Sequence, residues 1–509
     1  MTHKTQINRW LVASVGLAGV MLVLFVNHLG AGLSPDSAGY MAAARSLASG
    51  NGIRWFNGEL ITWWPPLYPA VLALVSILTG ADPLSCALGL NAIVFGLIIY
   101  VSGILLSYHV SSSPALVLAG TIAVLASIPV FSVSIMVWSE SLFLLFVVCY
   151  LLSIGWYVDR PNGTWFVALT LSTAFACLTR YIGVTLILSG SLSILVLCRG
   201  SLKKRLLACL SYGFASSFPV MLWLIHNYMQ TRTLTGPRTF TADARAILVL
   251  GEALHTIDAW FLPTRLLAHT PSAPVLITLW GLLILAAGVF WCRTAWYTAR
   301  SVLPVMIFAL IYFAFLTTSA VHMAFDPIDD RLLSPVFIPL LVVALTLVAQ
   351  GMRLVHGRLS KRALNMSLAV FFSIWLGLVP AKVILWHVQQ RATLGGWQYG
   401  SNVWQQSETI WFVKNQMLPP GCSVYSNDPY ALYLHTGLPV DYAPRWQDLM
   451  AQQASRPTFT PACFIWFSRY SSTPHAPDSQ QQAPALSPLA TFSDGAIYLF
   501  DAKPWLFAP

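Results

Sequence analysis

The sequence predicts a polytopic α-helical membrane protein of about eleven transmembrane helices, followed by a small C-terminal α/β domain outside the membrane. Of the 509 residues, 57% are hydrophobic and 9% are charged, whereas roughly a quarter of a soluble domain is charged. Apolar runs close to the ~20 residues that cross a bilayer recur from residue 10 to about residue 387. Beyond that point the chain is richer in Gln, Ser and Pro, and short β-like runs replace the long apolar ones.

Each long apolar run predicts one helix. The first run, Trp10–His28, is long for a signal-peptide core and no small-residue cleavage site clearly follows it, so we expect a retained helix. The other runs follow at intervals typical of a multi-pass protein. The predicted spans are 10–30, 84–107, 114–133, 138–157, 164–179, 181–198, 206–226, 274–292, 301–320, 332–350 and 365–387.

The basic residues predict the orientation of these helices. They gather in alternate connections, as the positive-inside rule requires of cytoplasmic loops. We therefore expect a cytoplasmic N-terminus in the cell (inner or plasma) membrane, with residues 31–83, 227–273 and 388–509 outside the cytoplasm. The net charge of +10 follows from this topology and does not indicate nucleic-acid binding. The basic residues are Arg199, Lys203, Lys204, Arg205, Arg293, Arg300, Arg353, Arg358, Lys361 and Arg362.

The tail from residue 388 carries the pattern of a small folded domain. The runs "CSVYSN", "CFIWFS" and "AIYLF" predict strands, and "SETIWFVKNQM" predicts a helix before the first of them. The stretch "SSTPHAPDSQQQAPALSP" is typical of a surface loop. Cys422 and Cys463 begin two predicted strands in an oxidising compartment, where either a disulfide or two buried thiols fits the sequence.

Motifs for nucleotides and zinc are missing from the sequence. It has no Cys/His cluster with zinc spacing and no Gly-rich phosphate-binding loop, so nothing supports a nucleotide-driven mechanism. No cofactor is assigned, and a divalent metal is compatible with the sequence without being indicated by it.

The first outer loop opens with a helix signal, "SPDSAGYMAAARSLA". Ser34 suits the N-cap, Pro35 suits the first helical position, and Asp36 falls in the first turn, where the helix dipole favours an ionised carboxylate. Asp36 is thus either a helix-stabilising residue or a catalytic one. Apolar residues at helical spacing predict a short amphipathic helix lying on the outer membrane surface. They are Tyr40, Met41, Ala44, Leu47 and Ala48.

The same loop ends with "WWPPLYP". Two interpretations are equally compatible with these aromatics and prolines: an interfacial anchor for a re-entrant loop, or the lining of a groove for a lipid chain or sugar ring. If a groove forms, its candidate residues are Tyr40, Trp64, Pro66 and Tyr68.

Polar and ionisable residues gather at the predicted outer ends of several spans. Glu140 lies near the outer end of 138–157, and Arg180 separates two short spans, which predicts a tight turn. Each charge alone is typical of a snorkelling or solvated side chain, although an ionisable residue within a span is a functional candidate. Their common membrane side favours a shared site. The remaining members are Asp326, Asp329, Asp330, Arg331, His226, Asn227, Arg232 and Arg238.

Four stretches resemble one family: "PDSAGYMAAARSLASGNG…PPLYP", "WSESLFLL", "LTRYIGVTLIL" and "DDRLLSPVFIPLL". Together they resemble the GT-C glycosyltransferases, in particular the bacterial branch related to protein O-mannosyltransferases (glycosyltransferase family 39) and to rhizobial lipopolysaccharide sugar transferases. The resemblance covers most of residues 10–345, and "VYSNDPYALYLHTGLPV" in the tail is similar to the outer domain of this branch.

The resemblance implies a GT-C membrane enzyme that uses a polyprenyl-phosphate sugar on the outer face of the membrane. It implies inverting transfer to an acceptor hydroxyl on a glycan, lipid or protein. Asp36 takes the place of the family's first-loop acidic residue and would accept the hydroxyl proton. Arg331, Arg238 and Arg180 are candidates for binding the leaving phosphate, and Glu140 would orient the acceptor, pair with an arginine or assist a metal.

The sequence also departs from the family pattern. Ser37 follows Asp36 where many relatives have a second acidic residue, which weakens a two-carboxylate metal site. Trp63 and Trp64 precede Pro65 where aminoarabinose transferases acting on lipid A have a lysine, and Gly39 stands in place of their arginine. Lipid A modification by aminoarabinose is therefore disfavoured.

Two other functions compete with a glycosyltransferase. A lipid-sugar transporter or flippase predicts ionisable groups near the bilayer midplane and related halves, and the sequence has neither. A non-catalytic assembly protein would leave the first-loop motif unexplained.

Overall fold

The computed structural model of the chain describes residues 8–110, 113–239, 246–262, 280, 296–323, 326–355, 361–415, 417–444, 461–468 and 488–500. Apart from residues 280 and 488, the predicted span 274–292 and the predicted tail loop lie outside this range. The side chains of five of the basic residues also lie outside it. These are Arg293, Arg300, Arg358, Lys361 and Arg362.

The chain forms two compact units. The first, here called the membrane unit, comprises Met1–His28, Thr62–Val71 and Ser85–Gln389. The second, the α/β unit, comprises Leu29–Ile61, Leu72–Leu84 and Gln390–Pro509. Most of the first predicted outer loop therefore shares a unit with the tail, although about three hundred residues of sequence lie between them, and Thr62–Val71 of the loop belongs to the membrane unit.

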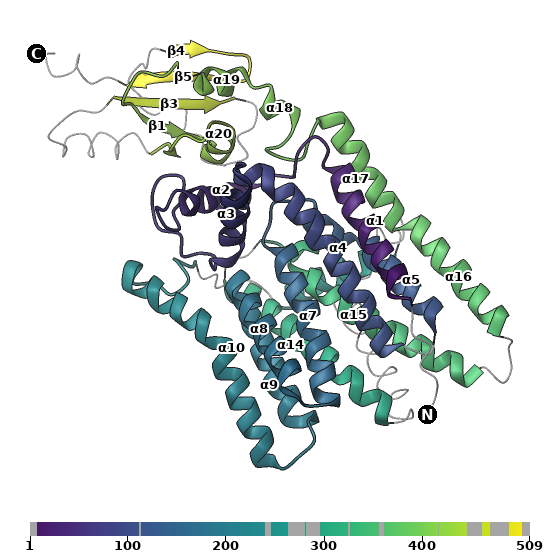
Figure 1. Cartoon of the computed structure of the whole chain (residues 1–509). Helices are drawn as coiled ribbons and strands as arrows, with labels where there is room; N and C mark the ends of the chain where they lie inside the picture. Colours follow the sequence, from purple (N-terminus) through teal and green to yellow (C-terminus); the bar gives the residue numbers. More distant parts are fainter. Residues whose placement is uncertain are drawn as a thin grey trace, which may run out of the picture. The chain divides into compact units, whose positions relative to one another are not determined.

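Long apolar helices make up the membrane unit (Figure 1). Seven helices in the described residues are long and apolar enough to cross a membrane, or eight if the bent pair α5 and α6 is one span. The helices are α1 (Arg9–Val26), α4 (Pro83–His109), α5 (Pro114–Leu125), α6 (Ile128–Ser134), α7 (Glu140–Asp159), α8 (Gly163–Thr179), α9 (Val184–Leu197), α10 (Leu202–Thr231), α11 (Ala246–Ala259), α14 (Trp296–His322), α15 (Asp330–Val355), α16 (Lys361–Leu378) and α17 (Pro380–Leu394).

Every predicted span outside 274–292 coincides with a described helix or helix pair. The structure differs from the predicted spans in two details. The span predicted at 114–133 is bent by 46° between α5 and α6, at a Ser-Ile-Pro sequence where proline removes a backbone donor. In addition, α8 and α9 are shorter than a full crossing. The polytopic helical class is thus confirmed, whereas the total of about eleven helices is not.

A tight reversal joins α8 to α9. Arg180 ends α8 and also precedes the 3-10 turn η1 (Tyr181–Gly183), after which α9 begins at once. A Cβ on Gly183 would lie 2.7 Å from the backbone of Ala176, so only glycine allows this close approach. The tight turn predicted around Arg180 is therefore confirmed, and it holds Arg180 between two packed helices.

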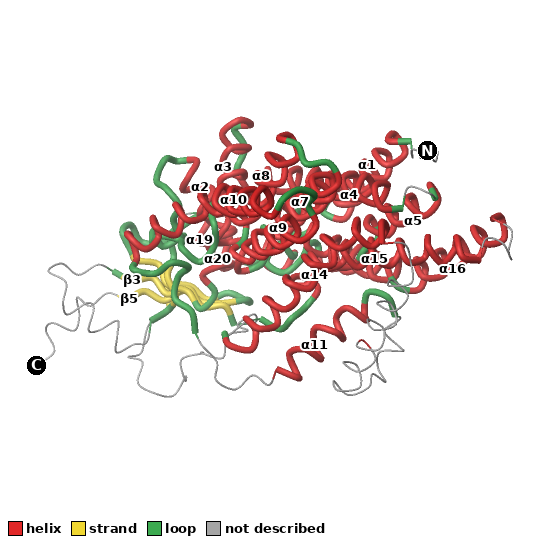
Figure 2. The backbone as a smooth tube through the Cα atoms, turned by 90° about the horizontal axis from the view of Figure 1, so that it is seen from below, coloured by secondary structure: helices red, strands yellow, loops and turns green. Residues whose placement is uncertain are grey.

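In the described residues, a mixed sheet of five strands organises the tail, and Figure 1 shows β1, β3, β4 and β5 of this sheet. Its order is β2-β1-β3-β5-β4, with β1 parallel to β2 and β3, and with β5 antiparallel to β3 and β4. Helices α19 and α20 lie beside the strands (Figure 2). The elements are α18 (Asn402–Gln405), α19 (Glu408–Lys414), β1 (Ser423–Ser426), α20 (Pro429–Thr436), β2 (Asp441–Tyr442), β3 (Ala462–Phe467), β4 (Pro488–Thr491) and β5 (Gly495–Phe500).

The three predicted tail strands and the helix before them are confirmed as β1, β3, β5 and α19. The short edge strands β2 and β4 were not predicted, because two and four residues are too few for a clear alternation of apolar side chains. Cys422 and Cys463 form a disulfide beside the paired strands β1 and β3, with their Cα atoms 5.8 Å apart. Of the two interpretations of this cysteine pair, the structure has the disulfide.

The first loop supplies α2 (Pro35–Ala48) to the α/β unit, and the predicted cap is present. Ser34 is the N-cap of this helix and Pro35 its first residue. The eight consecutive residues 37–44 are all buried, so burial runs around the whole helix. The prediction of an amphipathic helix that is buried on one side only is therefore wrong. The small side chains of "DSAG" and "AAA" allow neighbouring segments to approach on every side.

The tail holds the chain on the N-terminal side of α2. The backbone N–H of Leu33 donates to the carbonyl of Trp397, and the N–H of Tyr399 donates to the carbonyl of Leu33, at 3.4 and 3.2 Å. The buried guanidinium of Arg391 donates to the carbonyl of Gly30 at 3.2 Å. Along α2 itself, α20 packs against the helix. The first loop and the tail therefore fold as one body.

Removing the disulfide should destabilise the α/β unit. Cys422→Ser with Cys463→Ser opens a loop of 41 residues, and loop-closure entropy predicts a loss of about 4 kcal/mol in the free energy of unfolding. Thermal unfolding of the full-length protein in detergent, followed by tryptophan fluorescence, measures the loss. Cys209→Ser, which removes a free thiol on α10, is the matched control. Equal stability of the double variant and this control would contradict the prediction.

Candidate active site

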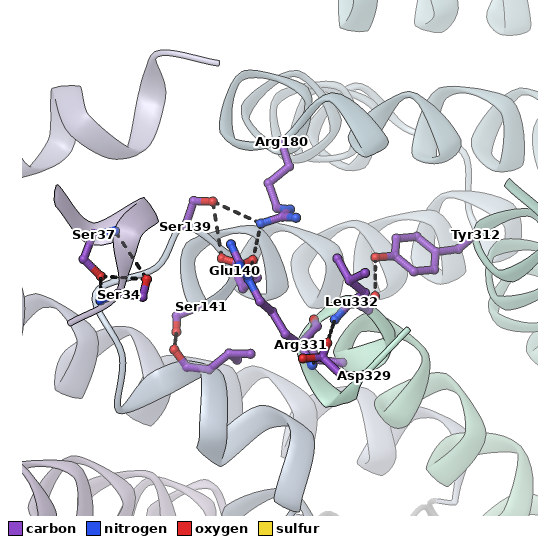
Figure 3. Close-up of polar contacts among 12 residues, drawn as sticks. Ser34, Ser37, Ser139, Glu140, Ser141, Arg180, Tyr312, Asp329, Arg331 and Leu332 are labelled. Carbon is purple, nitrogen blue, oxygen red and sulfur yellow. Dashed lines mark hydrogen bonds and ion pairs between the residues drawn. The ribbon is translucent and has the colours of Figure 1, made fainter. Parts of the chain in front are cut away.

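One buried carboxylate lies at the centre of the candidate site. Glu140 is the first residue of α7 and is 2% exposed. The guanidinium groups of Arg180 and Arg331 both form ion pairs with its Oε1 atom. Figure 3 shows the two arginines converging on Glu140 from different elements: Arg180 from the turn after α8, and Arg331 from the first turn of α15. These three candidates from the sequence are therefore brought together.

Neighbouring residues fix the position of each charged side chain. The hydroxyl of Ser139 lies 3.5 Å from Oε2 of Glu140 and accepts a hydrogen bond from Arg180 at 3.3 Å. The guanidinium carbon of Arg331 lies 4.4 Å from the ring centroid of Trp138, a cation–π contact. Sequence reasoning missed Trp138 and Ser139, although both stand in the quoted stretch "VWSES".

The start of α15 is capped by an aspartate beside this cluster. The carboxylate of Asp329 accepts backbone hydrogen bonds from Arg331 and Leu332 at 3.0 and 3.2 Å. Burial raises the pKa of Asp329, while these backbone donors and the charge of Arg331 oppose the rise. Asp330 accepts a hydrogen bond from the indole of Trp260 at 2.7 Å. Both aspartates thus stabilise the start of α15, and the start of α15 positions Arg331.

The charges of this cluster favour an anion. Two guanidiniums on one carboxylate leave an excess of one positive charge among the three side chains. Each guanidinium carries five N–H donors in a planar fork that matches the oxygens of a phosphate. The arrangement is therefore suited to hold a phosphate group against Arg180 and Arg331.

Arg238 occupies a different part of the membrane unit. Its guanidinium donates to the carbonyl of Trp63 at 3.3 Å, and Gly236, with φ of +77°, faces the Trp63 indole so closely that a Cβ would clash. The hydroxyl of Tyr181, next to Arg180, donates to the carbonyl of Thr62 at 2.8 Å. These contacts join the second predicted outer loop and η1 to the "WWPPLYP" stretch.

The aromatic candidates in "WWPPLYP" divide into two kinds. Tyr68 is 1% exposed, and its hydroxyl lies 3.5 Å from Oδ1 of Asn91, so its ring is part of the core. Trp64 and Pro66 are half-buried, and Trp64 meets Trp63 edge-on. Trp64 and Pro66 are thus better placed than Tyr68 to meet a ligand, and the groove remains a prediction.

In the α/β unit, Asp36 is half-buried in the first turn of α2. Ser37, which stands where many relatives have an acidic residue, completes the helix cap: its hydroxyl accepts from the Ser34 N–H at 2.9 Å, and its own N–H donates to the Ser34 hydroxyl (Figure 3). Tyr40 is 1% exposed and packs in the interior of the unit. In the part of the chain that the structure describes, no group of three or more His, Cys, Asp or Glu side chains could hold a metal ion.

A second buried carboxylate lies in the tail. Asp428 is the N-cap of α20, accepting a hydrogen bond from the Ala431 N–H at 3.2 Å, and Pro429 is the first residue of that helix. Burial raises the pKa of Asp428 to about 6, against the opposing effect of hydrogen bonds from Ala431 and from the Tyr399 hydroxyl. Asn427 exchanges two hydrogen bonds with the backbone of Phe467 in β3. Asn427 is thus a structural residue, whereas Asp428 is in addition a perturbed acid.

No protein-family model and no curated protein matches this sequence significantly. Solved structures do match. The ArnT protein of Cupriavidus metallidurans is similar in its apo state, with 16% identity and a TM-score of 0.61 over 98% of this chain and 99% of that one. The same protein bound to undecaprenyl phosphate gives 14% identity and a TM-score of 0.60 over 97% and 99%. The Archaeoglobus fulgidus oligosaccharyltransferase in complex with Zn and sulfate gives 11% identity and a TM-score of 0.54 over 89% and 68%.

The chain therefore has the fold of the GT-C membrane glycosyltransferases. Among these structures, ArnT matches nearly from end to end, with the helical part and the small C-terminal sheet both included in the aligned length. The fold class expected from the sequence is confirmed. At this level of identity the likeness defines the architecture, and the chemistry has to be argued from the site.

The three-residue charge cluster should be energetically coupled. Glu140→Gln leaves two arginines facing each other without their carboxylate, and we expect the free energy of unfolding to fall by about 3 kcal/mol. Adding Arg180→Gln to that variant should cost less than it costs in wild type, because the repulsion is relieved. Thermal unfolding of the four proteins of this cycle gives the coupling. Asp159→Asn, at the other end of α7, is a control, and strictly additive losses would contradict the coupling.

The elevated pKa of Asp428 predicts a specific pH dependence. The folded state holds this proton more tightly than the unfolded state, so its stabilising effect is complete below about pH 4 and is lost as the pH rises to about 6. The loss is about 3 kcal/mol, at about 1.4 kcal/mol for each pKa unit. Asp428→Asn keeps the helix cap and should remove this slope.

Melting temperatures of wild type and Asp428→Asn between pH 4 and pH 7 test this expectation. The difference between the two melting temperatures at each pH isolates the effect of Asp428 from that of other groups that titrate in the same range. Asp441→Asn, an exposed carboxylate in β2, should leave the wild-type slope in place. Parallel curves for wild type and Asp428→Asn would refute the assignment.

Proposed function

We propose that this protein is a membrane glycosyltransferase that transfers a hexose or pentose from a polyprenyl-phosphate donor to an acceptor hydroxyl, with inversion at the anomeric carbon. The observation that carries the proposal is the pairing of two arginines with the buried Glu140 in a chain of the GT-C fold. The similar ArnT protein was solved with undecaprenyl phosphate bound, a lipid of the class proposed here as the carrier.

The arginines would act on the leaving group. As the bond between the anomeric carbon and the phosphate oxygen breaks, its electron pair passes to the phosphate, and negative charge accumulates there. Arg331 and Arg180 can stabilise this charge because their guanidiniums match phosphate oxygens and are already held in place by Glu140. Preorganised donors do not have to reorient as the charge develops. Arg238, on the carbonyl of Trp63, is the third candidate for this role.

Asp36 would act on the acceptor. Its carboxylate takes the proton of the acceptor hydroxyl while the hydroxyl oxygen attacks the anomeric carbon, which gives a new glycosidic bond and free polyprenyl phosphate. Its half-buried place in the first turn of α2 supports this role, because the carboxylate is partly open to an acceptor. In this proposal Glu140 organises the phosphate site and takes no proton.

The remaining parts of the proposal concern location. The basic connections support a cytoplasmic N-terminus, with the α/β unit and the reaction on the outer side of the membrane. Trp64 and Pro66 are proposed to lie along the path of the donor's lipid or sugar. The acceptor is a glycan, a lipid or a protein on that side.

A transporter is less well supported by the site. Glu140 and Asp330 begin their helices, and Arg180 lies in the turn between two helices. Transport pathways place ionisable groups near the membrane midplane at broken helices. Charges at helix ends support surface chemistry on a lipid headgroup instead.

Asp36→Asn should abolish transfer while donor binding persists. The amide keeps the size of the side chain but cannot accept the proton, so we expect transfer to fall by about a hundredfold or more. Membranes containing each variant are incubated with radiolabelled undecaprenyl-phosphate sugars and candidate acceptors, with and without chelator. Binding of undecaprenyl phosphate itself should remain at the wild-type level.

Asp441→Asn provides the matched control for Asp36→Asn, as an exposed carboxylate of the same unit. Its transfer rate should equal that of wild type. Undiminished transfer by Asp36→Asn would remove this residue from the base role. Translocation of the lipid-linked sugar without transfer to any acceptor would favour the transporter.

A further inference from the structure

Tyrosine hydroxyls and carboxylates gather at one place in the α/β unit. Asp36 comes from the first loop, and Tyr399, Asp428, Tyr430 and Tyr442 come from the tail; we call these five residues the tyrosine–carboxylate cluster. The Tyr399 hydroxyl is hydrogen-bonded to Asp428, and the hydroxyls of Tyr430 and Tyr442 are hydrogen-bonded to each other. Tyr430 also lies within electrostatic reach of both Asp36 and Asp428.

Aromatic rings from the first loop and the tail pack around Tyr430 and hold it in this position. Its ring meets Trp55 edge-on at 6.1 Å and Phe56 edge-on at 5.7 Å, both from the first loop. One turn along α20, Tyr433 stacks on Phe56 at 5.2 Å. Tyr442 meets Tyr430 edge-on at 5.7 Å. The tail therefore presents Tyr430 and Tyr442 beside the loop that carries Asp36, on a rigid base.

The residues of the cluster differ in their exposure to solvent. Asp428 is 7% exposed, Asp36, Tyr399 and Tyr430 are half-buried, and Tyr442 is 50% exposed. The pKa of Tyr430 is raised, by burial first and also by the negative charge of the two aspartates, so its hydroxyl keeps its proton. The cluster thus offers aromatic faces together with hydroxyl donors and carboxylate acceptors.

The charge of the cluster excludes one class of ligand. Its two aspartates repel phosphate and carboxylate groups. Arg45 lies between two and three turns along α2 from Asp36, and its guanidinium is engaged by Asp82 at 2.8 and 3.1 Å. An anionic headgroup is disfavoured here.

We infer that the tyrosine–carboxylate cluster binds an uncharged sugar residue of the acceptor, so that the acceptor of this enzyme is a glycan. A sugar ring has an apolar face that packs on aromatic side chains and a rim of hydroxyls that both donate and accept hydrogen bonds. Tyr442 and Tyr430 supply the ring faces, and the carboxylates accept from sugar hydroxyls. This inference rests on the proposed function, because it assigns the acceptor of that reaction.

A peptide or a phosphorylated lipid headgroup fits these observations less well. An extended peptide needs a row of backbone hydrogen bonds along a free strand edge, whereas the cluster consists of side chains around a helix N-terminus and the two-residue strand β2. A phosphorylated headgroup needs cations, which the membrane unit supplies at Glu140 in the form of Arg180 and Arg331. The tyrosine–carboxylate cluster and the arginine pair at Glu140 thus suit two different substrates.

Binding measured without turnover tests the inference. Full-length protein in lipid nanodiscs is titrated with mannotetraose, cellotetraose, chitotetraose, a phosphorylated mannose oligosaccharide and a Ser/Thr-rich peptide, by thermophoresis. We expect at least one neutral tetrasaccharide to bind. Tyr442→Ala should weaken its affinity by about fivefold or more, which is the scale of one aromatic contact. Tyr442→Phe, which keeps the ring, should lie between Tyr442→Ala and wild type.

Trp411→Ala is the matched control, because Trp411 is an exposed aromatic (59%) on α19 of the same unit. Its glycan affinity should equal that of wild type, and all variants should retain the wild-type melting temperature and undecaprenyl-phosphate binding. Failure of every neutral tetrasaccharide to bind would overturn the inference. Equal affinity of Tyr442→Ala and wild type would also overturn it, as would Tyr442-dependent binding of the peptide or the phosphorylated sugar.

The same proteins separate this inference from the proposed function. Transfer from undecaprenyl-phosphate sugars without any Tyr442-dependent glycan binding would overturn only the inference. Tyr442-dependent glycan binding in a protein that transfers no sugar from any labelled donor would support the cluster as a glycan site and contradict the glycosyltransferase.

Discussion

The buried carboxylate of Glu140 is the interaction on which the membrane unit depends. It joins the start of α7, the turn after α8 and the start of α15 through two arginines, Arg180 and Arg331. Ser139 and Trp138 add a hydroxyl and an aromatic face to the same guanidiniums. Burying two cations without a partner would be costly, so the carboxylate fixes where three helix ends can lie. The cluster that would bind a phosphate is thus also the one that aligns these helices.

Different interactions hold the α/β unit together. It is built from backbone and ring contacts between the first loop and the tail: Leu33 pairs with the 397–399 segment, and Phe56 stacks on α20. The tyrosine–carboxylate cluster of this unit holds carboxylates and hydroxyls, whereas the candidate phosphate site of the membrane unit gathers guanidiniums around Glu140. Such a separation of charge suits a reaction with one anionic and one neutral substrate, because each site repels or fails to hold the other's ligand.

Local patterns in the sequence predicted most of the helices and strands. Most of the features that were not predicted depend on contacts between residues far apart in the sequence. Hydropathy located the spans, and the signals at Ser34 and Pro35 located the start of α2, because these features depend on a few consecutive residues. The pairing of Glu140 with Arg331 joins residues 191 positions apart, and no local pattern encodes it. The burial of α2 on all sides also arises from neighbours in space. The burial of Asp428 depends on the tertiary packing of the tail, which no local pattern encodes.

The contact between Arg391 and Gly30 spans 361 residues of sequence, and it has a consequence for how the protein is made. The helix that carries Asp36 leaves the ribosome early, while the segments that surround it are among the last to be synthesised. Domains that can fold from consecutive residues do so during synthesis, but this one has to wait for the end of the chain. Chains that stop before the tail would therefore contain the membrane helices and α2 without the segments that pack against α2. Only a chain that includes the tail can complete the α/β unit and, with it, the proposed acceptor site.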